Sequence, residues 1–181
     1  MLKAVALSAA ILAVSTPHVR KLGNAIVEYR DATMHSVAAY EYSHRFHDDA
    51  WLMIDVAVRT KERLSFRLGD FRLVTPGGTT LPLATEESFV GHPQQIQRIE
   101  QNARVWKRSL TNYFVDSDSA TFRFFALPGD VVVTNVIATY TYGPALVTLY
   151  FESPDAHWSE GSYQLVIDNG RARAVLPIEL K

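Results

Sequence analysis

Short apolar runs separated by turn residues constrain the fold of this chain more than any other feature. Residues 51–58 are rich in β-branched side chains and carry apolar residues on both faces, which predicts a buried, central strand. Further strands are predicted over residues 37–46, 66–74, 79–83, 121–126, 131–142, 145–151, 162–168 and 171–180. Several short strands with turn signals between them favour an all-β fold, an antiparallel β-sandwich.

Glycine-containing turns mark two places where the predicted strands reverse direction. Pro76-Gly77-Gly78 lies between two alternating runs and predicts a hairpin. Asp168-Asn169-Gly170 predicts a second hairpin near the C-terminus. Its Asn-Gly pair favours a type I′ turn, because both central residues of that turn need a positive φ.

One segment has the periodicity of a helix. Apolar residues recur there at steps of three and four, at Ile96, Ile99, Ala103, Trp106, Leu110 and Tyr113. This spacing places them on one stripe of an amphipathic helix. We therefore expect one inserted helix over about residues 93–110, with Trp106 packed against the sheet.

The ends of this helical region also have sequence signals. Pro93 suits the first position of a helix, and Glu100 lies one turn before Arg104, which is a favourable charge pair. Upstream, residues 85–88 (Thr-Glu-Glu-Ser) are typical of a capped helix start. The helical insertion is therefore expected to occupy about residues 86–112 of the sandwich.

The first fifteen residues have the pattern of an export signal. Lys3 precedes an apolar run over residues 4–14, and the small residues Ala13 and Ser15 flank its end. A positive charge, an apolar run of roughly 7–15 residues and small residues at the cleavage site describe a secretory signal peptide. The run is shorter than the roughly 20 apolar residues of a membrane-spanning helix, so no membrane span is expected. A core strand or helix would be similarly apolar and is the alternative.

These signals predict a simple organisation. Residues 1–15 are expected to be the signal peptide, and residues 16–181 a single exported domain, either periplasmic or extracellular. A chain of 181 residues is long enough to bury a sizeable core. The domain does not need disulfides for stability, and the sequence contains no cysteine.

The composition excludes several classes of function. Without cysteine, the chain has no thiolate nucleophile and no cysteine-based metal site. A net charge of −1 disfavours nucleic acid as a partner, because nucleic-acid-binding domains are normally strongly basic. The sequence also contains neither a phosphate-binding glycine loop nor a Gly-x-Ser-x-Gly nucleophile motif. We therefore predict no cofactor and no catalytic residue.

Two segments resemble secreted bacterial immunoglobulin-like β-sandwich proteins. Residues 51–83 are similar to the opening strands of such modules, and the Gly-x-Tyr-x-Leu pattern of residues 161–165 resembles their last hairpin. The resemblance implies an immunoglobulin-like sandwich with a structural role. It implies nothing about antigen-type recognition, because the two cysteines around a tryptophan that mark antibody domains are absent.

Histidine and carboxylate side chains gather near one predicted hairpin tip. His35, His44, His47 and Asp49 are candidate metal ligands, since imidazole and carboxylate groups suit zinc or a similar metal. On a strand, however, His44 and His47 would point to opposite faces unless the turn has already begun. A solvated hairpin tip is therefore the alternative. A metal at these residues would indicate a metal-dependent hydrolase.

Two further groups of residues are candidates for binding. The predicted helix has a basic face that could dock an acidic partner, formed by Arg98, Arg104, Lys107 and Arg108. Trp158 is predicted in a loop, where its ring could stack on a sugar. The leading hypothesis is an exported, non-catalytic binding or structural module that contacts another envelope protein or a surface glycan. A carbohydrate-binding module and a metal-dependent hydrolase are the alternatives.

Overall fold

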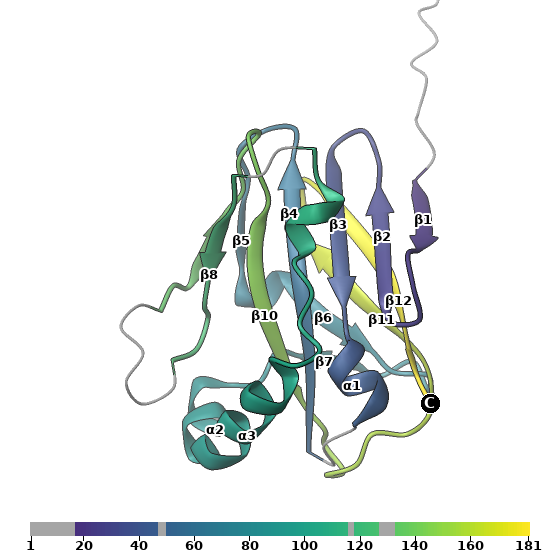
Figure 1. The fold of residues 1–181 in the computed structure, drawn as a ribbon, viewed down its shortest axis with the longest axis vertical. Coiled ribbons are helices and arrows are strands. Elements are labelled where there is room, and N and C mark those ends of the chain that lie inside the picture. The colour runs from purple at the N-terminus through teal and green to yellow at the C-terminus, as the bar shows by residue number, and fades with distance from the viewer. Residues whose placement is uncertain (1–16, 47–49, 116–117, 127–132) are drawn as a thin grey trace, which may run out of the picture.

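Two β-sheets pack face to face and enclose the main hydrophobic core, in agreement with the predicted all-β sandwich (Figure 1). The computed structural model describes residues 17–46, 50–115, 118–126 and 133–181. The predicted signal peptide, residues 1–15, lies outside the described residues.

The first sheet has six strands in the order β1-β2-β3-β4-β10-β8. Their bounds are β1 His18–Lys21, β2 Ile26–Arg30, β3 Met34–Ala39, β4 Trp51–Thr60, β8 Ala120–Phe122 and β10 Ala145–Glu152. As predicted, β4 is central, and Asp55 and Arg59 are its two residues that are not fully buried. The prediction of a purely antiparallel sandwich needs one correction, because β8 runs parallel to β10.

The second sheet has four strands in the order β12-β11-β6-β7, and it contains both predicted hairpins. Its strands are β6 Phe71–Val74, β7 Thr80–Pro82, β11 Gly161–Asp168 and β12 Arg173–Leu180. Gly78 has a φ of 84° in the β6–β7 turn, and Gly170 a φ of 81° between β11 and β12. The φ of Asn169 is not positive, although a type I′ turn requires this. The predicted type I′ turn is therefore wrong. Asp168 pairs with Arg173, and residues 169–172 form a longer loop.

A short third sheet pairs β5 (Ser65–Arg67) with β9 (Val136–Ala138). The sequence predicts one continuous strand over residues 66–74, but the 3-10 turn η1 (Leu68–Asp70) divides it. The carboxylate of Asp70 accepts a hydrogen bond from the backbone N–H of Arg67 at 2.7 Å, which stabilises this turn. As a result, β5 and β6 belong to different sheets.

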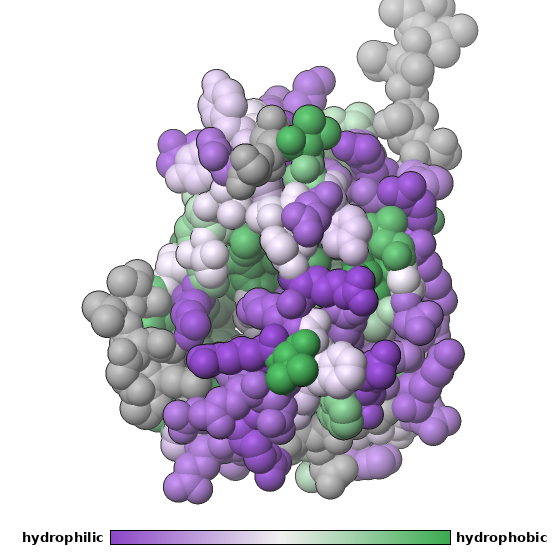
Figure 2. All heavy atoms as spheres, viewed as in Figure 1, coloured by the Kyte–Doolittle hydropathy of each residue, from purple (hydrophilic) through white to green (hydrophobic). Residues whose placement is uncertain are grey.

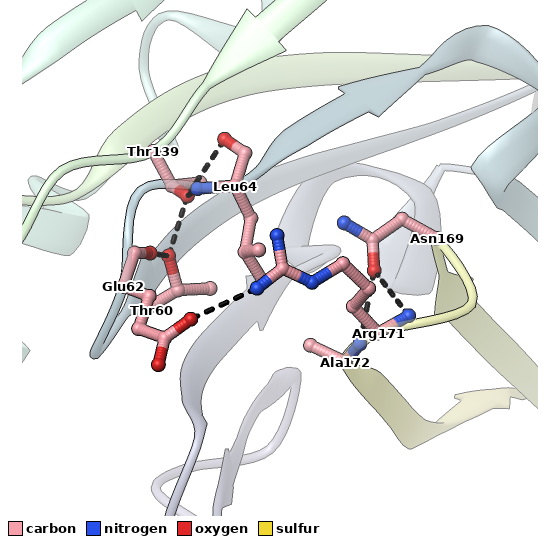
Figure 3. Close-up of polar contacts among 7 residues, drawn as sticks. All are labelled: Thr60, Glu62, Leu64, Thr139, Asn169, Arg171 and Ala172. Carbon is pink, nitrogen blue, oxygen red and sulfur yellow. Dashed lines mark hydrogen bonds and ion pairs between the residues drawn. The ribbon is translucent and has the colours of Figure 1, made fainter.

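Polar contacts join the ends of these sheets (Figure 3). The hydroxyl groups of Thr60 and Thr139 lie 2.5 Å apart and are buried. The guanidinium of Arg171, in the β11–β12 loop, donates to the carboxylate of Glu62 at 2.9 Å. Within that loop, the side-chain oxygen of Asn169 accepts the backbone N–H of Arg171 at 3.0 Å. Glu62 therefore ties the loop after β4 to the β11–β12 loop, and Thr60 ties the end of β4 to the segment after β9.

A short helix, α1 (Glu41–Arg45), occupies the second half of the predicted strand 37–46. The strand prediction is correct as far as Ala39 and wrong beyond it. In α1, the adjacent residues Tyr42 and Ser43 are both buried, which a solvent-facing strand could not achieve. The hydroxyl of Ser43 donates to the carbonyl of Met53 and accepts its N–H, both at 2.9 Å, so α1 is anchored to β4.

The predicted helical insertion is present, but its helix is shorter than expected. It comprises α2 (Glu86–Gly91), α3 (Pro93–Ala103) and the 3-10 turn η2 (Leu110–Tyr113). The hydroxyl of Thr85 accepts the N–H of Ser88 at 3.1 Å and caps α2, as predicted. Ile96, Ile99 and Ala103 form the buried stripe of α3. After Ala103 the chain leaves the helix through turns, so the expected end near residue 110 is wrong.

Candidate binding surface

The outer face of the six-stranded sheet carries a polar strip between two apolar regions. On one side, α2 and α3 cover the sheet, with the ring of Phe89 5.1 Å from that of Tyr150. On the other side, Leu110 and Phe114 of the η2 segment pack on Val37 and other residues of a second apolar cluster. In Figure 1, α3 lies near the lower end of this face and η2 crosses it higher up.

Asp55 lies in the polar strip, opposite Thr148 on the neighbouring strand β10. Its side chain is 14% exposed, and its carboxylate accepts a hydrogen bond from the Thr148 hydroxyl at 2.6 Å. The ammonium of Lys107 lies 3.3 Å from the same oxygen. A buried charge needs such partners, so this contact fixes the segment after α3 to the centre of the sheet.

Tyr150 and Glu100 make a second polar link, between β10 and α3. The Tyr150 hydroxyl donates to the Glu100 carboxylate at 2.8 Å. Burial raises the pKa of Tyr150 well above its usual value, and the Glu100 charge raises it further. The phenol therefore stays a hydrogen-bond donor. The predicted pairing of Glu100 with Arg104 is not among the ion pairs of the described residues, where Glu100 instead binds Tyr150.

A groove runs beside these residues. One part, of about 270 Å³, is lined by Asp55, Val56, Lys107, Arg108, Ser109, Leu110, Thr121, Leu146, Val147 and Thr148. An adjoining hollow of about 180 Å³ includes Arg104, Arg123 and Tyr150, and both parts share Lys107, Thr121 and Thr148. Figure 2 shows a hollow with apolar side chains at its floor and hydrophilic side chains around it. The groove thus combines apolar residues such as Leu146 with the polar residues Asp55 and Thr148 and with basic side chains.

The structure brings three of the four predicted basic residues together beside this groove. Arg104 and Lys107 line the groove, and Arg108 lies beside them. Arg108 also forms an ion pair with Glu41 of α1, at 2.9 Å. Arg98 instead lines a separate hollow near the start of α3. The sequence analysis missed Arg123, which follows β8 and reaches the groove through the tertiary fold alone.

An apolar patch stands next to the groove, and we call it the Trp106 patch; its members are Phe46, Val105 and Trp106. Val105 is 81% exposed and Phe46 is 49% exposed. The rings of Phe46 and Trp106 lie 5.8 Å apart, and the Arg45 guanidinium lies 4.5 Å above the Trp106 ring. In Figure 2, an apolar patch among hydrophilic side chains is visible on the lower half of the same face.

The described residues do not form the predicted metal site. His35 lies at the start of β3 and donates to the Glu28 carboxylate at 2.9 Å. His44 lies in α1, beyond the other end of β3, and its Nδ1 donates to the carbonyl of Glu179 at 2.8 Å. His47 and Asp49 lie outside the described residues. Within the described part of the chain, no three or more histidine, aspartate or glutamate side chains form a group that could hold a metal.

The predicted glycan platform at Trp158 needs correction. The side chain is 3% exposed, and its ring packs against that of Tyr163 with centroids 5.8 Å apart. A sugar could not stack on this ring, because the side chain is buried in the main core.

No family model, curated protein or solved structure matches this chain. Over the residues that the structure describes, no helix has the length and apolar character needed to cross a membrane. The geometry of the groove and its charged rim is therefore the basis for inferring a function.

Proposed function

We propose that this protein is an exported, non-catalytic binding module that docks an acidic segment of another envelope protein. One observation carries this proposal: Arg104, Lys107 and Arg108 come together beside a groove that is lined in part by apolar residues. Basic side chains attract an acidic partner and raise its rate of association. Leu146, which is only partly buried, offers it apolar contact in the groove.

The basic side chains are held in place and still accessible to a partner. The side chain of Lys107 is tied to Asp55 and remains 55% exposed. The side chain of Arg108 is tied to Glu41 and remains 65% exposed. Side chains that are already ordered lose less conformational entropy when a partner binds. This supports a specific docking surface over a set of freely solvated side chains.

We also propose that the domain is an immunoglobulin-like sandwich and that the protein is exported. Two packed sheets with antiparallel hairpins, such as β11–β12, are consistent with an immunoglobulin-like sandwich. The charged and apolar pattern of residues 1–15 supports export. A module of this kind would act by presenting one face to a partner while the sandwich provides rigidity.

Crosslinking in intact cells tests the proposed function. The tagged full chain is crosslinked, and captured proteins are identified by mass spectrometry. We expect one reproducible partner that is lost in the double variant Arg104→Glu/Arg108→Glu. The matched control, Lys61→Glu/Arg173→Glu, reverses two exposed charges elsewhere and should retain the partner.

Two results would overturn the proposal. One is a partner that the double variant captures as well as the unaltered protein does. The other is the capture of no protein at all, which would favour an acidic surface glycan as the ligand. Thermal unfolding of each variant is measured in parallel, because Arg108 pairs with Glu41 and its reversal must not unfold the protein.

A further inference from the structure

We infer that the Trp106 patch is the centre of the docking surface and that it accepts a bulky apolar residue flanked by aspartate or glutamate. This inference rests on the proposed function and names the chemistry of the partner segment. The ligand that we infer is a peptide, and the charges around the patch indicate that it is acidic.

The exposure and the packing of the patch favour recognition of an apolar anchor. Val105 is 81% exposed, although valine contributes more to stability when it is buried. The ring of Phe46 packs against that of Trp106, and the Arg45 guanidinium lies over the indole. These contacts hold the indole in one position, and tryptophan is among the residue types enriched where a few side chains supply most of the binding energy.

The charges around the patch identify the partner as acidic. Arg45 contacts the Trp106 ring, and Arg104 and Lys107 are neighbours of the patch in the chain. Of these cations, Lys107 has a carboxylate partner in Asp55, at 3.3 Å. A carboxylate on either side of the anchor would face these positive charges, which would fix the orientation of the bound segment.

A peptide fits this surface better than a flat lipid surface does. Lys107, next to Trp106 in the chain, lines the groove that also contains Asp55 and Thr148, and the Asp55 side chain is only 14% exposed. An extended segment could lie in the groove while its anchor contacts the patch. A membrane surface could contact the patch and the cations, but it could not enter the groove.

Selection from a random peptide library displayed on phage tests this inference, with the purified full chain as bait. We expect the enriched peptides to carry a tryptophan, phenylalanine or leucine next to aspartate or glutamate. Fluorescence anisotropy then measures the affinity of a labelled selected peptide. Val105→Asp should weaken binding by at least about tenfold, because it removes apolar contact and adds repulsion. The matched control is Val115→Asp, since Val115 is 89% exposed and lies outside the patch.

Three outcomes would overturn the inference. The selected peptides could lack the acidic and apolar combination, or they could bind the Val105→Asp variant as tightly as the unaltered protein. Thirdly, the protein could co-sediment with phosphatidylglycerol vesicles in a manner that depends on Val105, which would indicate a lipid surface. If the crosslinked partner is lost on reversal of Arg104 and Arg108 but kept by Val105→Asp, the proposed function stands and this inference fails.

Discussion

The imidazole of His35 and the carboxylate of Glu28 lie 2.9 Å apart on the outer face of the six-stranded sheet, and both residues are buried. Arg20 of β1 reaches the same carboxylate at 2.8 Å. The ring of Phe114 packs on His35 with centroids 4.3 Å apart. This pair therefore joins β1, β2, β3 and the segment after η2, and His35 has a structural role.

The buried pair predicts a pH dependence of stability. Burial lowers the pKa of His35 below its ordinary value of 6.5, although the Glu28 carboxylate opposes the shift. The unfolded chain then binds the proton more readily than the folded protein does. The free energy of unfolding is therefore highest above pH 6.5 and decreases as the pH falls from 6.5 towards the folded pKa. Urea unfolding at several pH values between about 5 and 8 measures this decrease.

The variant His35→Gln isolates the contribution of this residue. Glutamine does not titrate, and its amide can still donate a hydrogen bond to Glu28. We expect the variant to lose less stability than the unaltered protein does between neutral pH and about pH 5. An identical decrease in both proteins would show that another group causes it.

The ion pair between Lys107 and Asp55 predicts a measurable loss of stability. In Lys107→Met, Asp55 would keep the Thr148 hydroxyl but lose its cation. A largely buried carboxylate without a cation is unfavourable, so the free energy of unfolding should fall by about 1 kcal/mol. Chemical unfolding measures this change.

A double-mutant cycle provides the control. Asp55→Asn removes the charge and can keep the hydrogen bond from Thr148. If the pair acts as described, Lys107→Met should cost much less in the Asp55→Asn background. Equal costs in both backgrounds would mean that the two side chains do not interact in solution.

The strands that the sequence predicted best are those that are buried. Residues 51–58 fall within β4, and residues 145–151 and 162–168 match β10 and β11. Their apolar patterns reflect the core directly. The division at η1 depends on one hydrogen bond to Asp70, and the helix α1 spans five residues. Neither local contacts nor so short a helix leaves a periodic signal, so both were missed.

The candidate binding surface could be predicted in part. Arg104, Lys107 and Arg108 are close in sequence, and their shared location follows from that. Arg45 and Arg123 come from distant segments, and the fold alone brings them to the same face. Trp158 shows the opposite error, since its position in a loop indicated exposure while its ring completes the core.

The cap of α2 predicts a small and specific effect. The hydroxyl of Thr85 accepts the N–H of Ser88, and Thr85→Ala removes that acceptor. We expect the free energy of unfolding to fall by about 1 kcal/mol. Thr85→Asp should keep most of the stability, because an aspartate side chain caps helices equally well. Chemical unfolding of both variants tests this, and equal losses in the two would contradict a capping role.

Replacing Gly143 with alanine should destabilise the protein much more than the same replacement at Gly69. A Cβ atom at this position would lie 1.5 Å from the backbone oxygen of Asp118, which a side-chain rotation cannot relieve. Ala120 donates its N–H to the carbonyl of Pro144 at 3.2 Å, so the same contact region holds β8 beside β10. Gly143→Ala should therefore lower the free energy of unfolding by more than about 2 kcal/mol.

Gly69→Ala is the matched control for this prediction. A Cβ atom at Gly69 would have no heavy atom within 4 Å, and its φ is not in the positive region. An alanine there restricts the unfolded chain, so its stability should be equal to or slightly above that of the unaltered protein. Thermal and chemical unfolding of the two variants measure the difference. If Gly143→Ala were as stable as Gly69→Ala, the close contact between Asp118 and Gly143 would not exist in solution, and β8 would not be held beside β10 in this way.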